Sequence, residues 1–195
     1  GKHNVTRHAN IFAILFDFVD NKKKEQIYKQ VLNNEKIEPI NTPYFKLYEI
    51  SAICSLGYIE VAQKLLDSYW GGMLQKGATT MWEEYNPEQS IPACYEMYGS
   101  AFEKSLCHAW SSGPIYFLGK YCLGVTATEV GYAKYKVQPN PGRYTSFSGI
   151  VPTHKGIISV EYANGKLSVY SQLDGGTLIW GNKTYPIVKN KILTI

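Results

Sequence analysis

The sequence predicts a helical N-terminal part followed by a β-rich C-terminal part, and three observations carry this prediction. Apolar residues recur at helical spacing from about Thr6 to about Tyr69, and a further helix is expected before Gly124. Beyond Val130 the period changes to two, as in strands with one buried face. Turn sequences, Asn164-Gly165 foremost, separate the segments of this second pattern. With 195 residues, 45% of them hydrophobic, the chain can form one full domain or two small ones.

The first two expected helices differ in burial. The segment from Thr6 to Val19 is apolar on nearly every face, which predicts a helix buried all round. The segment from Lys22 to Asn33 instead gathers its apolar residues on one stripe and its lysines and glutamines elsewhere. One side of this second helix is therefore expected to face water.

The same pair of helices is expected to repeat. Thr42 supplies a cap and Pro43 a first-turn proline for a largely apolar helix from Tyr44 to Leu56, which Gly57 ends. An amphipathic helix follows, with apolar residues at Ile59, Ala62, Leu66 and Tyr69. Alternating buried and half-exposed helices, one pair per roughly 40 residues, indicate a double-layered helical toroid.

A long segment without periodicity, from about Gly71 to Ser105, precedes a fifth expected helix. Long loops in compact domains are usually functional. The fifth helix is expected from about Leu106 to Leu123 and ends at Gly124. Pro114 either kinks this helix or marks its true first turn.

The C-terminal residues predict a small antiparallel β-sandwich packed on the helices. Apolar residues alternate with polar ones in two runs, Ala133, Tyr135 and Val137 in the first and Ile158, Val160 and Tyr162 in the second. Asn164-Gly165 is a strong hairpin signal, and further turns are expected at Asp174-Gly175-Gly176 and Gly181-Asn182.

Composition argues against several classes of protein. The four cysteines show no CxxC spacing and are interpreted as buried thiols, so neither a metal nor a cofactor is expected. No apolar stretch approaches the about 20 residues of a membrane span. The net charge of +4 is small and spread out, so a nucleic-acid partner is not expected. Aromatic residues reach 14%, an excess typical of carbohydrate-binding proteins, although a helix-packed core explains most of them.

Two adjacent glutamates, Glu83 and Glu84, lie between Trp82 and Tyr85. Carboxylates flanked by aromatic side chains suit glycoside hydrolysis, because the aromatic rings stack on a pyranose face. Three motifs occur in order: Thr42-Pro43-Tyr44-Phe45, Gly77-Ala78-Thr79-Thr80-Met81-Trp82-Glu83, and Ser105-Leu106-Cys107-His108-Ala109-Trp110-Ser111-Ser112-Gly113-Pro114. Together they resemble the C-terminal part of bacterial α-L-rhamnosidases, glycoside hydrolase family 78. The similarity extends from about His8 to about Gly124, with a looser match through the β-rich remainder.

The resemblance implies the second half of an (α/α)6 toroid over residues 1–126 and an antiparallel β-sandwich over residues 127–195. A complete toroid needs more than twice the helices expected here, so we interpret the chain as the C-terminal fragment of a longer enzyme. Its expected partners are a rhamnose-containing carbohydrate and the missing N-terminal part of the same polypeptide. The apolar first helix also predicts an oligomer through its exposed face. A bacterial source is implied, but nothing selects among periplasm, cell exterior and cytoplasm.

The family reaction inverts the anomeric centre: a carboxylic acid protonates the leaving oxygen, and a carboxylate about 6.5–9.5 Å away activates water. By its position in the second motif, Glu83 corresponds to that general base. Glu84 is the alternative, and both residues can instead be surface charges of a loop. The general acid belongs to an earlier motif that has no match in this chain, so the chain alone is expected to be inactive.

The resemblance also implies substrate-binding residues. His108 matches a family histidine that hydrogen-bonds a rhamnose hydroxyl. Trp82 and Trp110 are candidates for an apolar wall around the rhamnose methyl group, and Tyr44 is a weaker one, with core packing as the alternative for each. Two other functions stay open: a different toroidal glycoside hydrolase, acting on glucose or an unsaturated uronide, and a non-catalytic carbohydrate-binding module.

Overall fold

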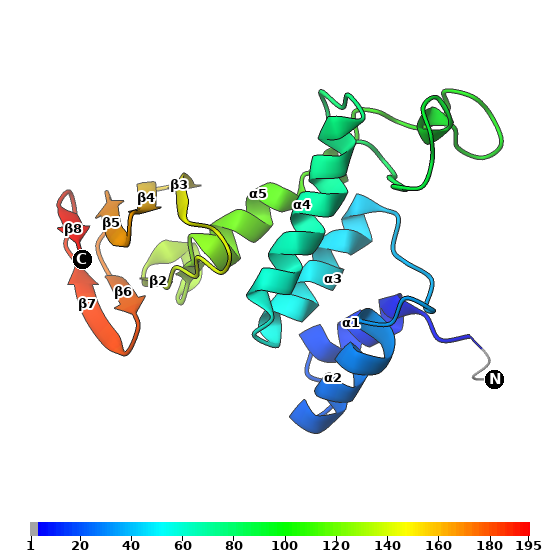
Figure 1. The fold of residues 1–195 in the computed structure, drawn as a ribbon. Helices are drawn as coiled ribbons and strands as arrows, with labels where there is room; N and C mark the ends of the chain where they lie inside the picture. The colour runs from blue at the N-terminus through cyan, green and yellow to red at the C-terminus, as the bar shows by residue number, and fades with distance from the viewer. Residues whose placement is uncertain (1–3) are drawn as a thin grey trace. The chain divides into compact units, whose positions relative to one another are not determined.

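A computed structural model describes residues 4–195, so the first three residues of the predicted domain 1–126 lie outside the described residues. The chain forms two compact units, Gly1–Pro114 and Ile115–Ile195. The first is helical and the second is built mainly of strands (Figure 1). The domain boundary expected between residues 126 and 127 stays a prediction.

From residue 4 onward, the helical unit contains four α-helices, a π-helical turn and two short 3-10 turns. In chain order these are α1 (Arg7–Leu15), α2 (Asn21–Ile27), the π-helical turn Tyr28–Leu32, α3 (Pro43–Ser55), α4 (Ile59–Gln75), and the 3-10 turns Ala93–Tyr95 and Ala109–Ser111. Helices α3 and α4 run antiparallel as a hairpin (Figure 1). Among residues 4–195, no helix combines the length and the hydropathy that crossing a membrane requires.

Helix α1 is shorter and less buried than the sequence predicts. It ends at Leu15, and Asp17 takes a left-handed backbone conformation with φ 55°. Ile11 and Ile14 are buried, whereas Phe16 and Phe18 are 58% and 75% exposed. The expectation of burial all round is therefore wrong in this structure, because α1 packs mainly on α3 and the α2 segment.

The next two helices lie close to their predicted positions. Helix α2 begins after Asp20, whose carboxylate accepts a hydrogen bond from the Lys23 amide at 2.7 Å. Helix α3 begins at Pro43, with Thr42 at the N-cap position, and the chain leaves it through Gly57 at φ 91°. The Thr42 side chain makes no capping hydrogen bond, so its hydroxyl is available for another contact.

Helix α4 continues further than the sequence predicts, to Gln75, so the irregular segment begins at Lys76 instead of Gly71. Gly72, in the part of this helix that was expected to be irregular, serves packing. A Cβ at Gly72 would stand 2.3 Å from the Tyr85 hydroxyl oxygen, so only glycine lets this ring approach the helix.

A buried ionic network joins α1 to α3. Glu49 is 0% exposed, and its two carboxylate oxygens pair with Arg7 Nη1 at 2.6 Å and Lys46 Nζ at 2.7 Å. Arg7 also donates to the carbonyl oxygens of Leu32 and Asn34 at 2.7 and 3.1 Å. One carboxylate thus holds two cations, and the arginine ties down the chain that leaves α2.

The fifth predicted helix is shorter than expected. Helix α5 (Gly113–Phe117) continues as a π-helical turn, Leu118–Cys122, and the chain leaves it through Gly124 at φ 70°. Pro114 lies in the first turn, so the second of the two interpretations of this proline is correct. The residues from Leu106 to Ser112 are not α-helical and form the last part of the long loop.

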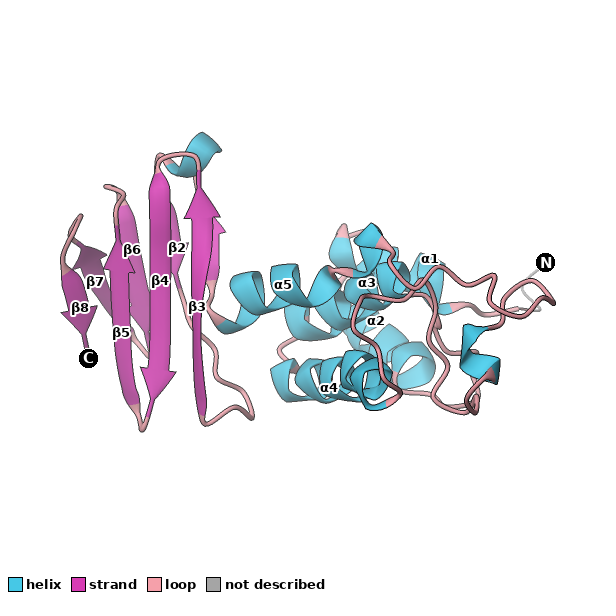
Figure 2. Cartoon of the chain, turned by 90° about the horizontal axis from the view of Figure 1, so that it is seen from above, coloured by secondary structure: helices cyan, strands magenta, loops and turns pink. Residues whose placement is uncertain are grey.

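The second unit is a two-sheet sandwich (Figure 2). Its strands are β1 (Val125–Ala127), β2 (Tyr135–Val137), β3 (Ser146–Thr153), β4 (Gly156–Ala163), β5 (Lys166–Ser171), β6 (Gly176–Trp180), β7 (Lys183–Ile187) and β8 (Ile192–Thr194). The sheet orders are β1-β2-β6-β7 and β3-β4-β5-β8. Fully buried side chains from both sheets, among them Val137, Val160 and Leu178, form one core.

The two predicted hairpin turns are confirmed, whereas Gly176 of the third expected turn is the first residue of β6, and one strand pairing is a correction. Asn164 and Gly165, at φ 52° and 75°, join β4 to β5 as a two-residue hairpin, and Gly181-Asn182 joins β6 to β7. Strands β2 and β6 pair in parallel, so the sandwich is not purely antiparallel. Strands β3, β4 and β5 follow β2 in the chain and lie in the other sheet. Parallel pairing needs a long connection of this kind, which allows β6 to run in the same direction as β2.

Candidate active site

A small pocket in the helical unit brings distant parts of the sequence together. It has a volume of about 180 Å³ and is lined by Thr42, Tyr44, Glu83, His108, Trp110 and Ser111. The lining comes from the start of α3 and from both ends of the long loop. Four residues predicted from the sequence, Tyr44, Glu83, His108 and Trp110, therefore meet here.

Main-chain pairing across the loop positions Glu83. Its amide donates to the Ser105 carbonyl oxygen at 2.9 Å, and the Ser105 amide donates to Glu83 Oε2 at 3.1 Å. Two residues earlier, the Met81 carbonyl oxygen accepts from the His108 amide at 2.8 Å. These contacts fix one carboxylate oxygen of Glu83, and Oε1 has no hydrogen-bond partner among residues 4–195.

The neighbouring carboxylate, Glu84, has a different environment. Its Oε2 lies 3.8 Å from Nζ of Lys104, a side chain that is fully buried. Lys104 Nζ also donates to the Cys94 carbonyl oxygen at 2.7 Å. Glu84 does not line the pocket. Its charge instead compensates a buried ammonium group, which would be costly to leave unpaired.

Aromatic side chains line the same pocket as Glu83. The rings of His108 and Trp110 stack with centroids 5.2 Å apart and planes 18° apart, and Tyr44 meets Trp110 at 5.6 Å. No hydrogen bond joins the His108 imidazole to any described residue. The pocket thus offers a fixed carboxylate, a free imidazole and two exposed aromatic faces.

The helical part of the chain matches one family along most of its length. Residues 1–122 match the model of the bacterial α-L-rhamnosidase six-hairpin glycosidase domain. The chain belongs to this family. The predicted family and the predicted order of folds, helical toroid and then β-sheets, are confirmed. No curated protein matches the sequence.

Solved rhamnosidase structures share the fold of this family member. A GH78 family rhamnosidase of Bacillus sp. GL1 is 23% identical with a TM-score of 0.68, over 86% of this chain and 17% of that one. The α-L-rhamnosidase from Aspergillus terreus is 15% identical with a TM-score of 0.77, over 97% and 24%. That of Streptomyces avermitilis, complexed with L-rhamnose, is 18% identical with a TM-score of 0.65, over 89% and 18%. The chain thus spans between 17% and 24% of the length of these proteins.

Trp82 is the one predicted site residue that does not line the pocket of this rhamnosidase-family chain. Its ring is 2% exposed and contacts the rings of Tyr85 and Tyr95 at 6.5 and 5.5 Å. Its carbonyl oxygen accepts a hydrogen bond from Ser111 Oγ at 2.7 Å. Trp82 is therefore packed in the core, which was the alternative to a role in the pocket. It supports the pocket through its hydrogen bond with the lining residue Ser111.

Two lining residues were not predicted as part of the site. Thr42 was interpreted as a helix cap, and Ser111 was interpreted only as part of a motif. The sequence signal that could have identified Thr42 as a site residue is its place in the motif Thr42-Pro43-Tyr44-Phe45. Ser111 has a structural role: its hydroxyl donates to the Trp82 carbonyl oxygen, and its own carbonyl oxygen accepts from Trp70 Nε1 at 2.9 Å.

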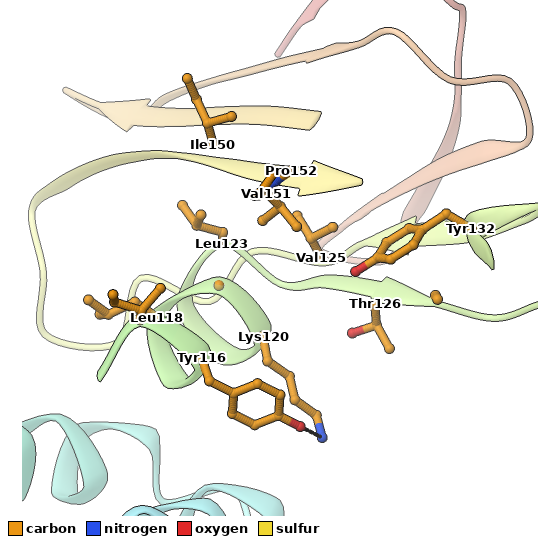
Figure 3. A pocket seen from close by; sticks show the side chains of 13 residues that line it. Tyr116, Leu118, Lys120, Leu123, Val125, Thr126, Tyr132, Ile150, Val151 and Pro152 are labelled. Atoms are coloured by element: carbon orange, nitrogen blue, oxygen red, sulfur yellow. Dashed lines mark hydrogen bonds between the residues drawn. The ribbon is translucent and has the colours of Figure 1, made fainter. Parts of the chain in front are cut away.

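A larger pocket in the second unit lacks the groups that glycoside hydrolysis requires. It has a volume of about 550 Å³ and is mainly apolar, between the helical segment and strands β1 and β3 (Figure 3). Its polar groups include Thr126, Tyr132 and Lys120, and the Lys120 ammonium donates to the Tyr116 hydroxyl at 2.9 Å. None of the described residues that line it is a carboxylate. Within the part of the chain that the structure describes, no group of three His, Cys, Asp or Glu side chains could hold a metal ion.

Proposed function

We propose that this chain is the base-bearing part of an enzyme that releases terminal α-L-rhamnose from glycans or rhamnosides with inversion. The proposal rests on one observation: Glu83, His108 and Trp110 line the same pocket in a chain that belongs to a rhamnosidase family. The rest of the enzyme is supplied by further polypeptide, since the similar solved structures are several times longer than this chain. The oligomer expected from exposed apolar residues stays a prediction.

In this proposal Glu83 acts as the general base. The Ser105 amide holds Oε2 at 3.1 Å, so Oε1 is left to accept a hydrogen bond from a water molecule. As that water attacks the anomeric carbon, its proton passes to the carboxylate and the bond to the leaving oxygen breaks. The general acid that protonates the leaving oxygen lies elsewhere in the enzyme, because Glu83 is the one carboxylate among the described lining residues.

The other lining residues bind the sugar. The exposed rings of Trp110 and Tyr44 provide an apolar surface for the methyl group, which distinguishes rhamnose from glucose. The unpaired His108 imidazole hydrogen-bonds a sugar hydroxyl. No arginine or lysine lines the pocket in the described residues, which argues against an unsaturated uronide as substrate.

We expect His108→Ala in the complete enzyme to raise KM for an aryl α-L-rhamnoside about two- to tenfold, because one hydrogen bond to substrate contributes roughly 0.5–1.5 kcal/mol. The measurement is steady-state kinetics with the purified variant. His154→Ala is a control, since His154 is an exposed histidine in the second unit. A KM for His108→Ala equal to that of the unmodified enzyme would contradict the role.

The stereochemistry of the product tests the proposal as a whole. We expect the complete enzyme to release β-L-rhamnose first from an aryl α-L-rhamnoside, with the α anomer appearing only by mutarotation. Proton NMR during the first minutes of the reaction measures this order. Initial release of the α anomer would exclude inversion, and turnover of another glycoside alone would favour a different toroidal hydrolase. Binding of L-rhamnose without turnover of any glycoside would favour a carbohydrate-binding module.

A further inference from the structure

A buried charge lies next to the residue that holds the candidate base. The Ser105 carbonyl oxygen accepts from the Glu83 amide at 2.9 Å, and the Ser105 amide donates to Glu83 Oε2 at 3.1 Å. Lys104 directly precedes Ser105, and its side chain is 0% exposed. Contacts within this chain produce that burial, so it does not depend on further polypeptide.

Lys104 is fixed to the 3-10 turn Ala93–Tyr95 by both its side chain and its main chain. Its Nζ donates to the Cys94 carbonyl oxygen at 2.7 Å, and its amide donates to the Tyr95 carbonyl oxygen at 3.3 Å. Cys94 is itself 1% exposed. The path of the chain just before Ser105 is therefore set by a buried turn.

The same turn also supports the other member of the pair. The Tyr95 ring packs edge-on against the ring of Trp82, with centroids 5.5 Å apart, and Trp82 is 2% exposed. Trp82 directly precedes Glu83. Glu83 and Ser105 thus each follow a residue that contacts the turn, which keeps the two segments in register with one another.

Core packing alone does not explain a lysine at this position. Burying an ammonium group removes its water, a cost that an apolar side chain of similar length avoids. The nearest carboxylate offers little in return, since Glu84 Oε2 is 3.8 Å away and the Glu84 side chain is 25% exposed. The charge-assisted hydrogen bond to the Cys94 carbonyl oxygen is the contact that only a cationic donor provides.

We propose that Lys104 is a positioning residue for the general base. It fixes Ser105, and through Ser105 it keeps the Glu83 carboxylate in the orientation that leaves Oε1 to accept from water. This proposal rests on the proposed function. Lys104 does not line the pocket, so it affects proton transfer and not the binding of the sugar.

Lys104→Met tests this role, because methionine has a similar length but no donor for the Cys94 carbonyl oxygen. In the complete enzyme we expect kcat for an aryl α-L-rhamnoside to fall about 10- to 100-fold, the scale of a small misplacement of a reacting group. KM should stay close to that of the unmodified enzyme, since the residues that bind the sugar are unchanged. Steady-state kinetics measures both constants.

Azide separates a misplaced base from general damage. The azide ion attacks the anomeric carbon as the bond to the leaving oxygen breaks, and it has no proton to give up, so it needs no base. We expect azide to restore turnover to Lys104→Met, with β-L-rhamnosyl azide as the product by NMR. The ratio of turnover with and without azide is measured in one preparation, so an unfolded fraction does not alter it.

Two further variants are matched controls. Lys76→Met is the same substitution in a lysine that donates to other carbonyl oxygens of this loop, those of Asn86 and Pro87 at 3.3 and 3.0 Å. It should keep the kcat of the unmodified enzyme and gain nothing from azide. The double variant Glu84→Gln/Lys104→Met leaves no unpaired charge, so it remains measurable where Lys104→Met folds poorly. It should show the same loss and the same recovery.

The outcomes distinguish this proposal from the proposed function. A kcat for the Lys104 variants within a few-fold of the unmodified value, or a loss without recovery in azide, would overturn the positioning role. The function of Glu83 would then stand on Glu83→Gln alone. An unmodified enzyme that cleaves no α-L-rhamnoside would overturn both proposals.

Discussion

Glu83→Gln is expected to lower kcat of the complete enzyme by about 10²–10⁴-fold, the contribution typical of a positioned general base. Glutamine has the same size as glutamate, and its side-chain oxygen can still accept a hydrogen bond from the Ser105 main-chain amide. The pairing of the two ends of the loop is therefore preserved. Glutamine cannot take a proton from water. Since substrate binding relies on the aromatic residues and His108, KM should change much less than kcat. Steady-state kinetics on an aryl α-L-rhamnoside measures both constants.

The adjacent residue is the matched control. Glu84→Gln changes the same functional group one position along the chain, but Glu84 faces Lys104 and lies outside the pocket. We expect the kcat of the folded protein to stay within a few-fold of the unmodified value, whereas the loss of the counter-charge to buried Lys104 should lower the free energy of unfolding. A small anionic nucleophile such as azide needs no base, so adding it should restore turnover to Glu83→Gln alone. Comparable losses in the two variants, without recovery in azide, would mean that Glu83 serves structure and not proton transfer.

The fold was predictable wherever short-range chemistry decides it. Pro43 and Gly57 fix helix ends through groups within a few residues, and Asn164-Gly165 fixes a hairpin because both residues adopt positive φ. Helix α1 was predicted too long and too buried, because an apolar pattern does not say which packing partners are present. The parallel pairing of β2 with β6 also depends on the path of the intervening strands.

The site was predictable as a set of residues but not as a geometry. Nothing local distinguishes Glu83 from Glu84. The difference comes from Ser105 and Lys104, which lie about twenty residues further along the chain and approach only in the folded loop. The ring of Trp82 has the core position that the sequence left as its alternative, because Tyr85 and Tyr95 pack against it. Side-chain orientation across a loop is a long-range property.

The largest expected effect on stability concerns Glu49. Its fully buried carboxylate holds Arg7 at 2.6 Å and Lys46 at 2.7 Å, and Lys46 also lies over the Tyr69 ring at 5.3 Å. Glu49→Gln leaves two largely buried cations without a counter-charge. Breaking a buried pair in this way costs about 3–5 kcal/mol, because the remaining charge keeps its desolvation penalty and loses its attraction. Urea denaturation of the enzyme that contains this chain measures the free energy of unfolding.

Two comparisons identify the origin of that loss. Asp17→Asn breaks the ion pair with Lys24, in which Asp17 is 81% exposed, and is expected to cost at most about 1 kcal/mol because water screens the charge. Replacing all three members of the network, Arg7→Met, Lys46→Met and Glu49→Leu, should recover much of the stability, since no unpaired charge then stays buried. A loss below about 1 kcal/mol for Glu49→Gln would mean that water reaches this network in solution. A triple variant less stable than Glu49→Gln would mean that the hydrogen bonds of Arg7 to the α2 segment, and not charge balance, hold α1 in place.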